Sequence, residues 1–207
     1  MNLHKTFSST VATAVFTAAF LISLIGGAFA EEINARNGFS IKAGVDMPGT
    51  MDLNYNGSEV SKDMKTGFSG TVEYAKGFNE MFSFGGGVSG QMPRGVDAAG
   101  FDGKLGFIDG YGLVNFVIPV KTEGFNFYTS LQLGVSMPFS DDEFKDNLGS
   151  DTSLSGDIYW GAAAGVIINR NYIIEAYYKA HHGEVEQGNN ADEFEYRHFG
   201  VSVGYQF

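Results

Sequence analysis

The last ten residues alternate strictly between apolar and small or polar side chains, and this alternation constrains the fold more than any other feature. The apolar set is Phe199, Val201, Val203, Tyr205 and Phe207, and the set between them is His198, Gly200, Ser202, Gly204 and Gln206. Successive side chains of a strand point to opposite faces, so the segment predicts a strand with one apolar face. A soluble sheet packed on a core shows the same alternation, so the pattern by itself leaves the solvent open.

The first thirty residues differ from the rest of the chain. Lys5 gives a weakly basic start, residues 11–25 form an apolar stretch, and Ala28 and Ala30 supply the small side chains that a signal peptidase reads. We therefore predict a cleaved signal peptide over 1–30 and one domain over 31–207. The alternative is an uncleaved anchor, for which the apolar stretch is short, since a span needs about 20 residues.

Composition excludes several classes of protein. The chain has no Cys, which rules out disulfides, a lipid-modified cysteine and thiolate chemistry. Its 13 Lys and Arg against 24 Asp and Glu give a net charge of −11 and argue against nucleic acid, whose binding needs a basic surface. With 19 Phe, 10 Tyr and 29 Gly but no long apolar run after residue 30, the chain is predicted to be all-β and not a helical membrane protein.

Eight segments of the mature chain are predicted as strands, and the connections between them alternate in length. The strands are expected at 38–47, 67–78, 81–91, 104–119, 125–137, 154–168, 172–182 and 194–207. Long loops are expected at 48–66, 92–103, 138–153 and 183–193, and short turns near 79–80, 121–124 and 169–171. This is the plan of a transmembrane β-barrel, with short turns at one rim and long loops at the other. A soluble sandwich or lipocalin-like barrel is the alternative.

The strand at 104–119 fits the alternation least well. Asp109 and Asn115 share a face with Phe107, Tyr111 and Leu113. We expect a β-bulge near Gly110 or Gly112 to shift the alternation by one residue and separate the two kinds of side chain.

The signal peptide, the eight amphipathic strands, the alternating loop lengths and the closing sequence GVSVGYQF together resemble the small bacterial outer-membrane β-barrel superfamily, with its OmpA/OmpX-type, opacity-type and OmpW-type barrels. The resemblance covers residues 31–207. It implies a monomeric, eight-stranded, antiparallel up-and-down barrel in the outer membrane of a Gram-negative-type bacterium, in contact with lipid and lipopolysaccharide. It also implies that the barrel-assembly machinery reads Tyr205 and Phe207. It supplies no catalytic residue, metal ligand or cofactor.

The barrel interior is expected to be a polar plug. Eight strands leave an interior barely wide enough for its own side chains, so open diffusion of solutes is not expected. The inward network is predicted to contain Lys42, Glu73, Glu175, Lys179 and His198, with Asp46 and Asp157 as further charged candidates, and buried charges of mixed sign must pair. One register places Lys179 opposite His198 and Glu175 near Ser202. A narrow proton or ion path is the alternative.

The outer surface and the loops carry further candidates. Aromatic girdles at the membrane interfaces are predicted from Phe39, Phe68, Phe78, Phe82, Phe125, Tyr172, Tyr205 and Phe207. Arg197 could meet a lipopolysaccharide phosphate or be a solvated surface residue. The carboxylates of Asp141, Asp142, Glu143, Asp146, Asp151, Glu184, Glu186, Asp192 and Glu193 could hold a divalent cation, but they lack calcium-loop spacing and are read as a solvated surface.

We predict a structural or surface-interaction role through four extracellular loops, whose partners could be host or cell-surface ligands. One alternative is a narrow channel or a conduit for small hydrophobic ligands of the OmpW-like porin family. A second is a lipid A-modifying enzyme, for which His181, His182, Glu184, Ser153 and Ser155 are the available groups. Adjacent histidines point to opposite faces of a strand, so at most one of the two could serve.

Overall fold

The computed structural model describes residues 36–55, 58–97, 103–118, 124–148, 152–187 and 190–207. The predicted signal peptide, with Ala28 and Ala30, lies outside the described residues.

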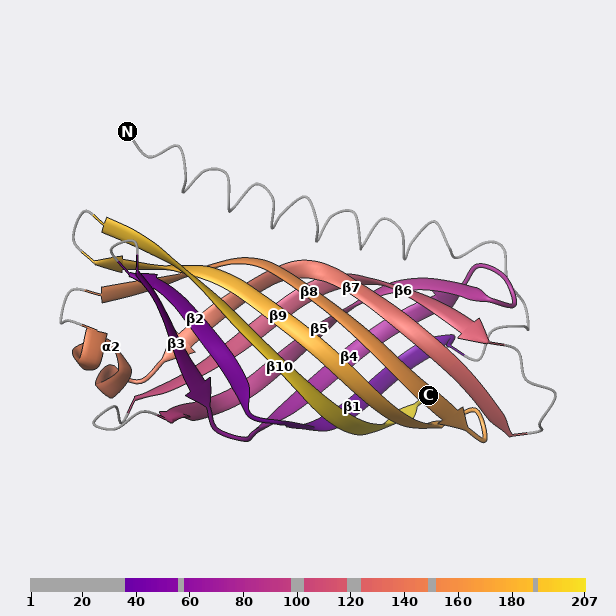
Figure 1. Cartoon of the computed structure of the whole chain (residues 1–207). Helices are drawn as coiled ribbons and strands as arrows, with labels where there is room; N and C mark the ends of the chain where they lie inside the picture. Colours follow the sequence, from indigo (N-terminus) through magenta and orange to yellow (C-terminus); the bar gives the residue numbers. More distant parts are fainter. Residues whose placement is uncertain (1–35, 56–57, 98–102, 119–123, 149–151, 188–189) are drawn as a thin grey trace.

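The described chain is a closed antiparallel β-barrel (Figure 1). Eight strands form the ring in the order β1, β4, β5, β6, β7, β8, β9, β10, and β10 pairs with β1 to close it. Two further strands, β2 and β3, lie between β1 and β4 in the sequence and form a hairpin that pairs with β10 through β2 and with β5 through β3. The elements are β1 (Gly38–Asp46), β2 (Gly49–Tyr55), β3 (Ser58–Met64), β4 (Gly67–Gly77), β5 (Phe82–Asp97), β6 (Lys104–Ile118), β7 (Phe125–Ser140), α2 (Asp142–Leu148), β8 (Thr152–Ile168), β9 (Tyr172–Gln187) and β10 (Asn190–Gln206). The predicted fold class is confirmed.

The two ends of the barrel differ, and we name them by what they hold. The C-terminal end holds Phe207, the start of β1 and the tight turns at 78–81 and 169–171. In the first turn the side chain of Asn79 accepts hydrogen bonds from the backbone of Met81 and Phe82 at 2.9 and 2.8 Å. In the second, Asn169 and Arg170 both have positive φ, as a type I′ hairpin turn requires. The opposite end, the α2 end, holds the β2–β3 hairpin and α2.

The four segments predicted as long loops are largely ordered structure, so that part of the prediction is wrong. Residues 48–66 contain the β2–β3 hairpin, and β5 continues to Asp97. The 138–153 segment contains the end of β7, the helix α2 and the start of β8. In the 183–193 segment, β9 and β10 pair up to Gln187 and Asn190. Strands of 16 or 17 residues exceed the 9–11 or so that cross a bilayer, so the sheet continues beyond the membrane-crossing length.

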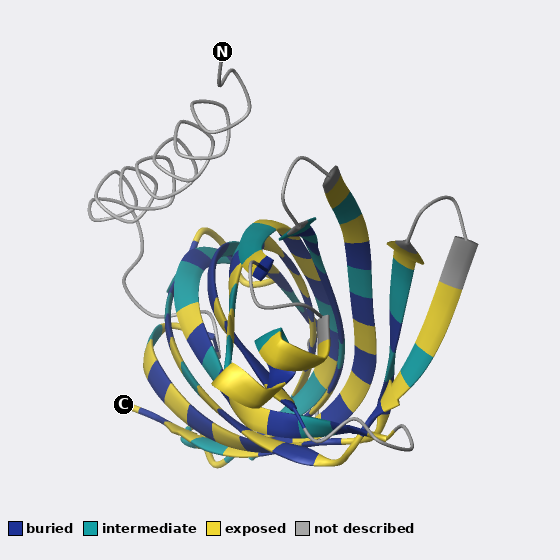
Figure 2. Cartoon of the chain, turned by 90° about the vertical axis from the view of Figure 1, so that its left-hand side faces the viewer, coloured by how far each residue is buried: buried dark blue, intermediate teal, exposed yellow. Residues whose placement is uncertain are grey.

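The outer surface carries an apolar belt around the part of the barrel nearer its C-terminal end, and Figure 2 shows the alternation of buried and exposed residues along each strand. On β10 the belt begins at Phe199 and continues through Val201, Val203 and Tyr205, all of them exposed. The eight aromatic residues predicted for the girdles are all exposed on this surface. In the same stretch the inward residues are polar, among them His198, Ser202 and Gln206. A soluble barrel has the opposite arrangement.

The polarity of the two faces reverses toward the α2 end. On β10, Phe194 and Tyr196 are buried inside, whereas Glu193 and Arg197 lie on the outside. The strand β2 has the same reversed arrangement: Met51 is buried inside the barrel, and its neighbour Asp52 faces outward. The strands therefore keep a period of two while the apolar face moves from the outside to the inside.

The β-bulge expected in the strand at 104–119 does not occur. All of β6 is described, and it pairs with β7 without a register shift. Asp109 and Asn115 do share the inward face with Phe107, Tyr111 and Leu113, and all five are buried. The interior accepts this mixture because its layers alternate between polar and apolar contacts.

The bulges lie elsewhere, between Gln91 and Arg94 in β5 and between Gly156 and Tyr159 in β8. The second one corrects another prediction. It shifts the alternation of β8 so that Asp157 is exposed and not part of the interior.

By helix length and hydropathy, no helix within the described ranges could cross a membrane.

Candidate functional site

The interior of the barrel brings together the residues predicted for the lumen network. Lys42, Glu73, Glu175, Lys179 and His198 are all buried inside it. Lys179 pairs with His198 and Glu175 with Ser202 across β9 and β10, which is the register expected from the sequence. Asp46 is also buried inside, at the end of β1.

Two carboxylates form the centre of a network toward the C-terminal end. Glu73 accepts hydrogen bonds from Arg36 Nη2 at 2.7 Å, Lys42 Nζ at 3.0 Å and Tyr111 Oη at 2.8 Å. Glu175 accepts from Lys42 Nζ at 2.8 Å and from the hydroxyl of Tyr128 at 2.7 Å. Lys42 of β1 thus bridges an acid from β4 on one side of it and an acid from β9 on the other.

A second network lies toward the α2 end. Asp46 accepts from Arg94 Nη2 at 2.8 Å and from Tyr177 Oη at 2.5 Å. Asp109 accepts from Ser89 Oγ at 2.7 Å and from Ser136 Oγ at 2.8 Å. Lys179 Nζ donates to Ser89 at 3.0 Å, which links this lysine to Asp109 through the hydroxyl.

The buried charges balance in each network. Within the described ranges, the buried cations of the interior are Arg36, Lys42, Arg94 and Lys179, and the buried carboxylates are Asp46, Glu73, Asp109 and Glu175. An unpaired buried charge is strongly destabilising, whereas a paired and hydrogen-bonded one is tolerated. The interior is therefore electrically neutral when its two histidines, His181 and His198, carry no charge.

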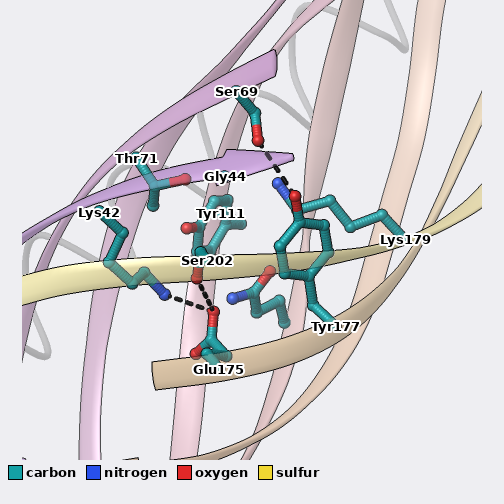
Figure 3. Close-up of a pocket in the computed structure, with 10 residues that line it drawn as sticks. Lys42, Gly44, Ser69, Thr71, Tyr111, Glu175, Tyr177, Lys179 and Ser202 are labelled. Atoms are coloured by element: carbon teal, nitrogen blue, oxygen red, sulfur yellow. Dashed lines mark hydrogen bonds and ion pairs between the residues drawn. The ribbon is translucent and has the colours of Figure 1, made fainter. Parts of the chain in front are cut away.

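A small cavity separates the two networks (Figure 3). Its volume is about 10 Å³, roughly the space that one water molecule needs. Lys42 and Glu175 line it from the first network, and Tyr177 and Lys179 from the second. Polar side chains fill the rest of the middle of the barrel.

Apolar side chains close the α2 end of this polar middle. The buried cluster there contains Met51, Met64, Val96, Leu105, Phe107, Phe144, Val185, Phe194 and Tyr196. Toward the C-terminal end a smaller cluster of Val117, Tyr128, Ile167 and Ile173 lies on β6 to β9, and the buried polar residues Ser40, Ser83, Asn115 and Gln206 continue the polar interior beside it. An ion path needs a continuous wet line, and the cluster at the α2 end interrupts it.

The helix α2 supplies the outermost part of the apolar cluster at its end. It lies across the mouth of the barrel in Figure 2, and its Phe144 is buried in the cluster. Asp141 caps the helix, because its Oδ1 accepts from the backbone N–H of Phe144 and of Lys104, each at 2.9 Å. This bond to Lys104 ties α2 to the start of β6.

The candidate enzyme residues do not form a catalytic set. His181 is buried, and its Nδ1 lies 3.0 Å from Ser136 Oγ and 3.1 Å from Asp109 Oδ1. The same ring nitrogen therefore contacts both groups, whereas a catalytic triad needs one nitrogen at the serine and the other at the acid. His182 points outward, 3.7 Å from Glu195, which agrees with the prediction that the two histidines face opposite ways. Ser153 donates to Glu186 at 3.2 Å.

Metal coordination finds no candidate among the acidic residues that the structure describes. In these ranges no three histidine, aspartate or glutamate side chains converge as metal ligands would. Arg197, predicted to meet phosphate or solvent, forms ion pairs with Asp52 and Glu195 on the outer surface.

Sequence reasoning missed several members of the interior. Arg94 was placed in a loop because the bulge after Gln91 interrupts the alternation. Tyr111 shares a face with Asp109, and the bulge expected near Gly110 or Gly112 would have separated them, whereas both face inward and the Tyr111 hydroxyl donates to Glu73. Arg36 precedes the first strand, where no periodicity could indicate that it turns inward.

The ring of eight strands and the inverted faces define a small eight-stranded β-barrel of the outer-membrane type. Three solved structures are similar to it: the outer membrane protein OprG of Pseudomonas aeruginosa (15% identity, 85% of this chain and 99% of that one, TM-score 0.46), the neisserial surface protein A (17%, 83% and 98%, 0.47) and the outer membrane protein AlkL (12%, 87% and 94%, 0.48). No protein-family model and no curated protein matches the sequence.

Proposed function

We propose that this protein is a closed barrel of the bacterial outer membrane that holds an ordered surface structure above the lipid. The observation that supports the location is the apolar belt, which would face lipid, around an interior of paired charges. The tight turns and both described chain ends would lie on the periplasmic side, and the β2–β3 hairpin and α2 outside the cell.

The surface-interaction role follows from the part of the barrel beyond the belt. There the outward residues are polar or acidic, among them Asp52, Glu193 and Glu195, and the sheet continues as a rigid collar. Pre-ordered strands lose less conformational entropy on binding than flexible loops do, so a collar of this kind suits recognition of a cell-surface or host ligand.

The single observation that argues for a closed barrel is the neutral polar network with the apolar cluster at its α2 end. We expect no resolved conductance steps from the purified protein in planar bilayers at about pH 7.5, with an open porin as the positive control. Stable, repeated steps would overturn the closed-barrel proposal. The membrane location has its own test, because a protein recovered in the soluble periplasmic fraction would not be an outer-membrane barrel.

A second candidate function is a conduit for small hydrophobic ligands, and one feature of the wall favours it. Pairing between β7 and β8 stops at Val135 and Ile158, so the ends of these strands beside α2 are not paired with each other. The apolar cluster with Phe144 lies behind them. Phe144→Ala should then increase uptake of a small fluorescent hydrocarbon into proteoliposomes, and unchanged uptake would leave only the closed-barrel proposal.

A further inference from the structure

The amide of Gln91 lies between the two buried histidines. Its Nε2 is 3.0 Å from His181 Nε2 and 3.3 Å from His198 Nε2. Its Oε1 accepts a hydrogen bond from Arg94 Nη2 at 2.6 Å. Because the guanidinium can only donate, the Gln91 oxygen must face Arg94, and the NH₂ group must face the histidines.

This arrangement fixes the protonation of His181. The Gln91 NH₂ group donates and cannot accept, so His181 Nε2, 3.0 Å away, has to be the acceptor. The ring is then neutral with the proton on Nδ1, which can donate to Asp109 Oδ1 at 3.1 Å. A proton added to this Nε2 would place two donors face to face. His198 Nε2 lies 3.3 Å from the amide and 3.4 Å from Asp46 Oδ1, and its Nδ1 has no hydrogen-bond partner within the described residues, so this geometry fits either neutral tautomer of His198.

The surroundings of His181 offer no spare negative charge. Asp109 of β6 faces it but is already balanced by Lys179 of β9, which donates through Ser89. The remaining titratable groups packed on the ring are Tyr159 of β8 and Tyr196 and His198 of β10, and the His198 ring stacks on it with centroids 5.5 Å apart.

His198 has similar neighbours. Asp46 of β1 lies 3.4 Å from its Nε2 and already pairs with Arg94 of β5. Tyr177 of β9 and Tyr196 of β10 also pack on the ring. Since the interior is neutral without the histidines, a proton on either one adds a positive charge that nothing nearby compensates.

We propose that Gln91, His181 and His198 form a proton-sensitive lock, which keeps the lumen closed while both histidines are neutral and releases the apolar layer above them when they take up protons. The proposal rests on the closed lumen proposed above.

Stacking connects this lock to the apolar layer. The ring of His181 stacks on Phe107 with centroids 4.5 Å apart, and the ring of His198 stacks on Tyr196 at 5.0 Å. Phe107 and Tyr196 are both members of the apolar cluster at the α2 end, and they stack on each other at 5.5 Å. When the Gln91 bridge breaks, the two rings that support this cluster lose their fixed positions.

The direction of the pH response follows from proton counting. The closed lumen holds its histidines uncharged, and a hydrated, open lumen lets them charge, so opening takes up protons. For each proton taken up on opening, the ratio of open to closed barrels should rise about tenfold for every unit by which the pH falls. This slope applies between the protonation equilibrium of the closed barrel and that of the open barrel. Single-channel recording from about pH 7.5 down to about pH 4.5 covers the range in which histidine titrates.

Three variants test the lock in that assay. His182→Gln removes an outward histidine one residue away and should respond to pH as the unmodified protein does. The double variant His181→Gln, His198→Gln cannot take up the protons and should stay closed at acid pH. Gln91→Glu provides an acceptor and a negative charge for protonated histidines, so it should stay closed at acid pH and open more often at neutral pH.

The results separate the two proposals. Conductance at neutral pH in the unmodified protein would refute the closed barrel, whatever its pH dependence. A closed barrel that does not open on acidification, or a double variant that still opens, would refute the lock. Should the variants fail to fold, ¹⁵N NMR of the unmodified protein at about pH 7.5 decides: the lock requires the Nδ1–H tautomer for His181 and a neutral ring for His198, and an Nε2–H tautomer of His181 or a charged ring in either would overturn it.

Discussion

Replacing Glu73 by glutamine should reveal how much the neutral interior contributes to stability. Glu73 is buried, with an exposed fraction of 1%, and its carboxylate pairs with both Arg36 and Lys42. Glu73→Gln keeps the shape but leaves two buried cations facing the single carboxylate of Glu175. Removing one partner of a buried pair typically costs about 3–5 kcal/mol, so we expect a loss of that size in the free energy of unfolding.

The assay is equilibrium unfolding in urea with the protein in lipid vesicles, followed by tryptophan fluorescence and by heat-modifiable gel migration. Glu195→Gln is the matched control. Its carboxylate lies 3.8 Å from Arg197 and has an exposed fraction of 33%, so its loss should cost at most about 1 kcal/mol.

A double variant tests whether the loss of stability comes from the unbalanced charge. Adding Lys42→Met to Glu73→Gln removes the excess cation and leaves Arg36 with Glu175, so the double variant should be more stable than Glu73→Gln alone. If the two losses simply add, or if Glu73→Gln costs no more than Glu195→Gln, charge balance is not what stabilises the interior.

Three further predictions concern other parts of the barrel. Phe207→Ala should lower the amount of assembled barrel in cells while leaving the unfolding free energy of the assembled protein nearly unchanged, because the Phe207 ring is 70% exposed; an equal loss of both would contradict a role in assembly. Gly134→Ala should prevent or weaken folding, since a Cβ there would collide with the carbonyl of Gly110 and with Tyr111, whereas Gly70→Ala, with no heavy atom within 4 Å, should fold normally on a refolding gel. His181→Ala should leave the lipid A mass spectrum of expressing cells unchanged, and an altered acyl pattern would revive the enzyme alternative.

The strands and the lumen were predictable because both follow from alternation. Lys42, Glu175 and Lys179 were identified as inward by parity alone, and the register that joins β9 to β10 followed from matching their inward faces. Such reasoning works wherever a strand is regular and one face must meet lipid.

Prediction from the sequence failed where a β-bulge shifts the alternation and where the apolar face of a strand changes from outward to inward. One extra residue after Gly156 turned Asp157 outward, and no residue type marks that bulge in advance. The sequence predicts a loop for the β2–β3 hairpin because most of its residues are polar, whereas Met51 and Met64 face inward. The inward placement of Asp109 was not predicted, because Asp109 shares a face with Phe107. The lumen changes from polar to apolar between these two residues.

In the proposed membrane location, the reversal of polarity along the strands would give the barrel a single height in the bilayer. On β10 the change falls between Arg197 and Phe199, and on β8 between Asp157 and Trp160. If the barrel sank by one pair of residues, about 7 Å along the strand and about 5 Å along the membrane normal at the usual tilt, Arg197 would enter hydrocarbon; if it rose by the same step, Phe199 would leave it. The collar, α2 and any ligand bound there are therefore held at a fixed distance from the lipid surface, and a bilayer of different thickness would have to deform around the belt instead of shifting the protein.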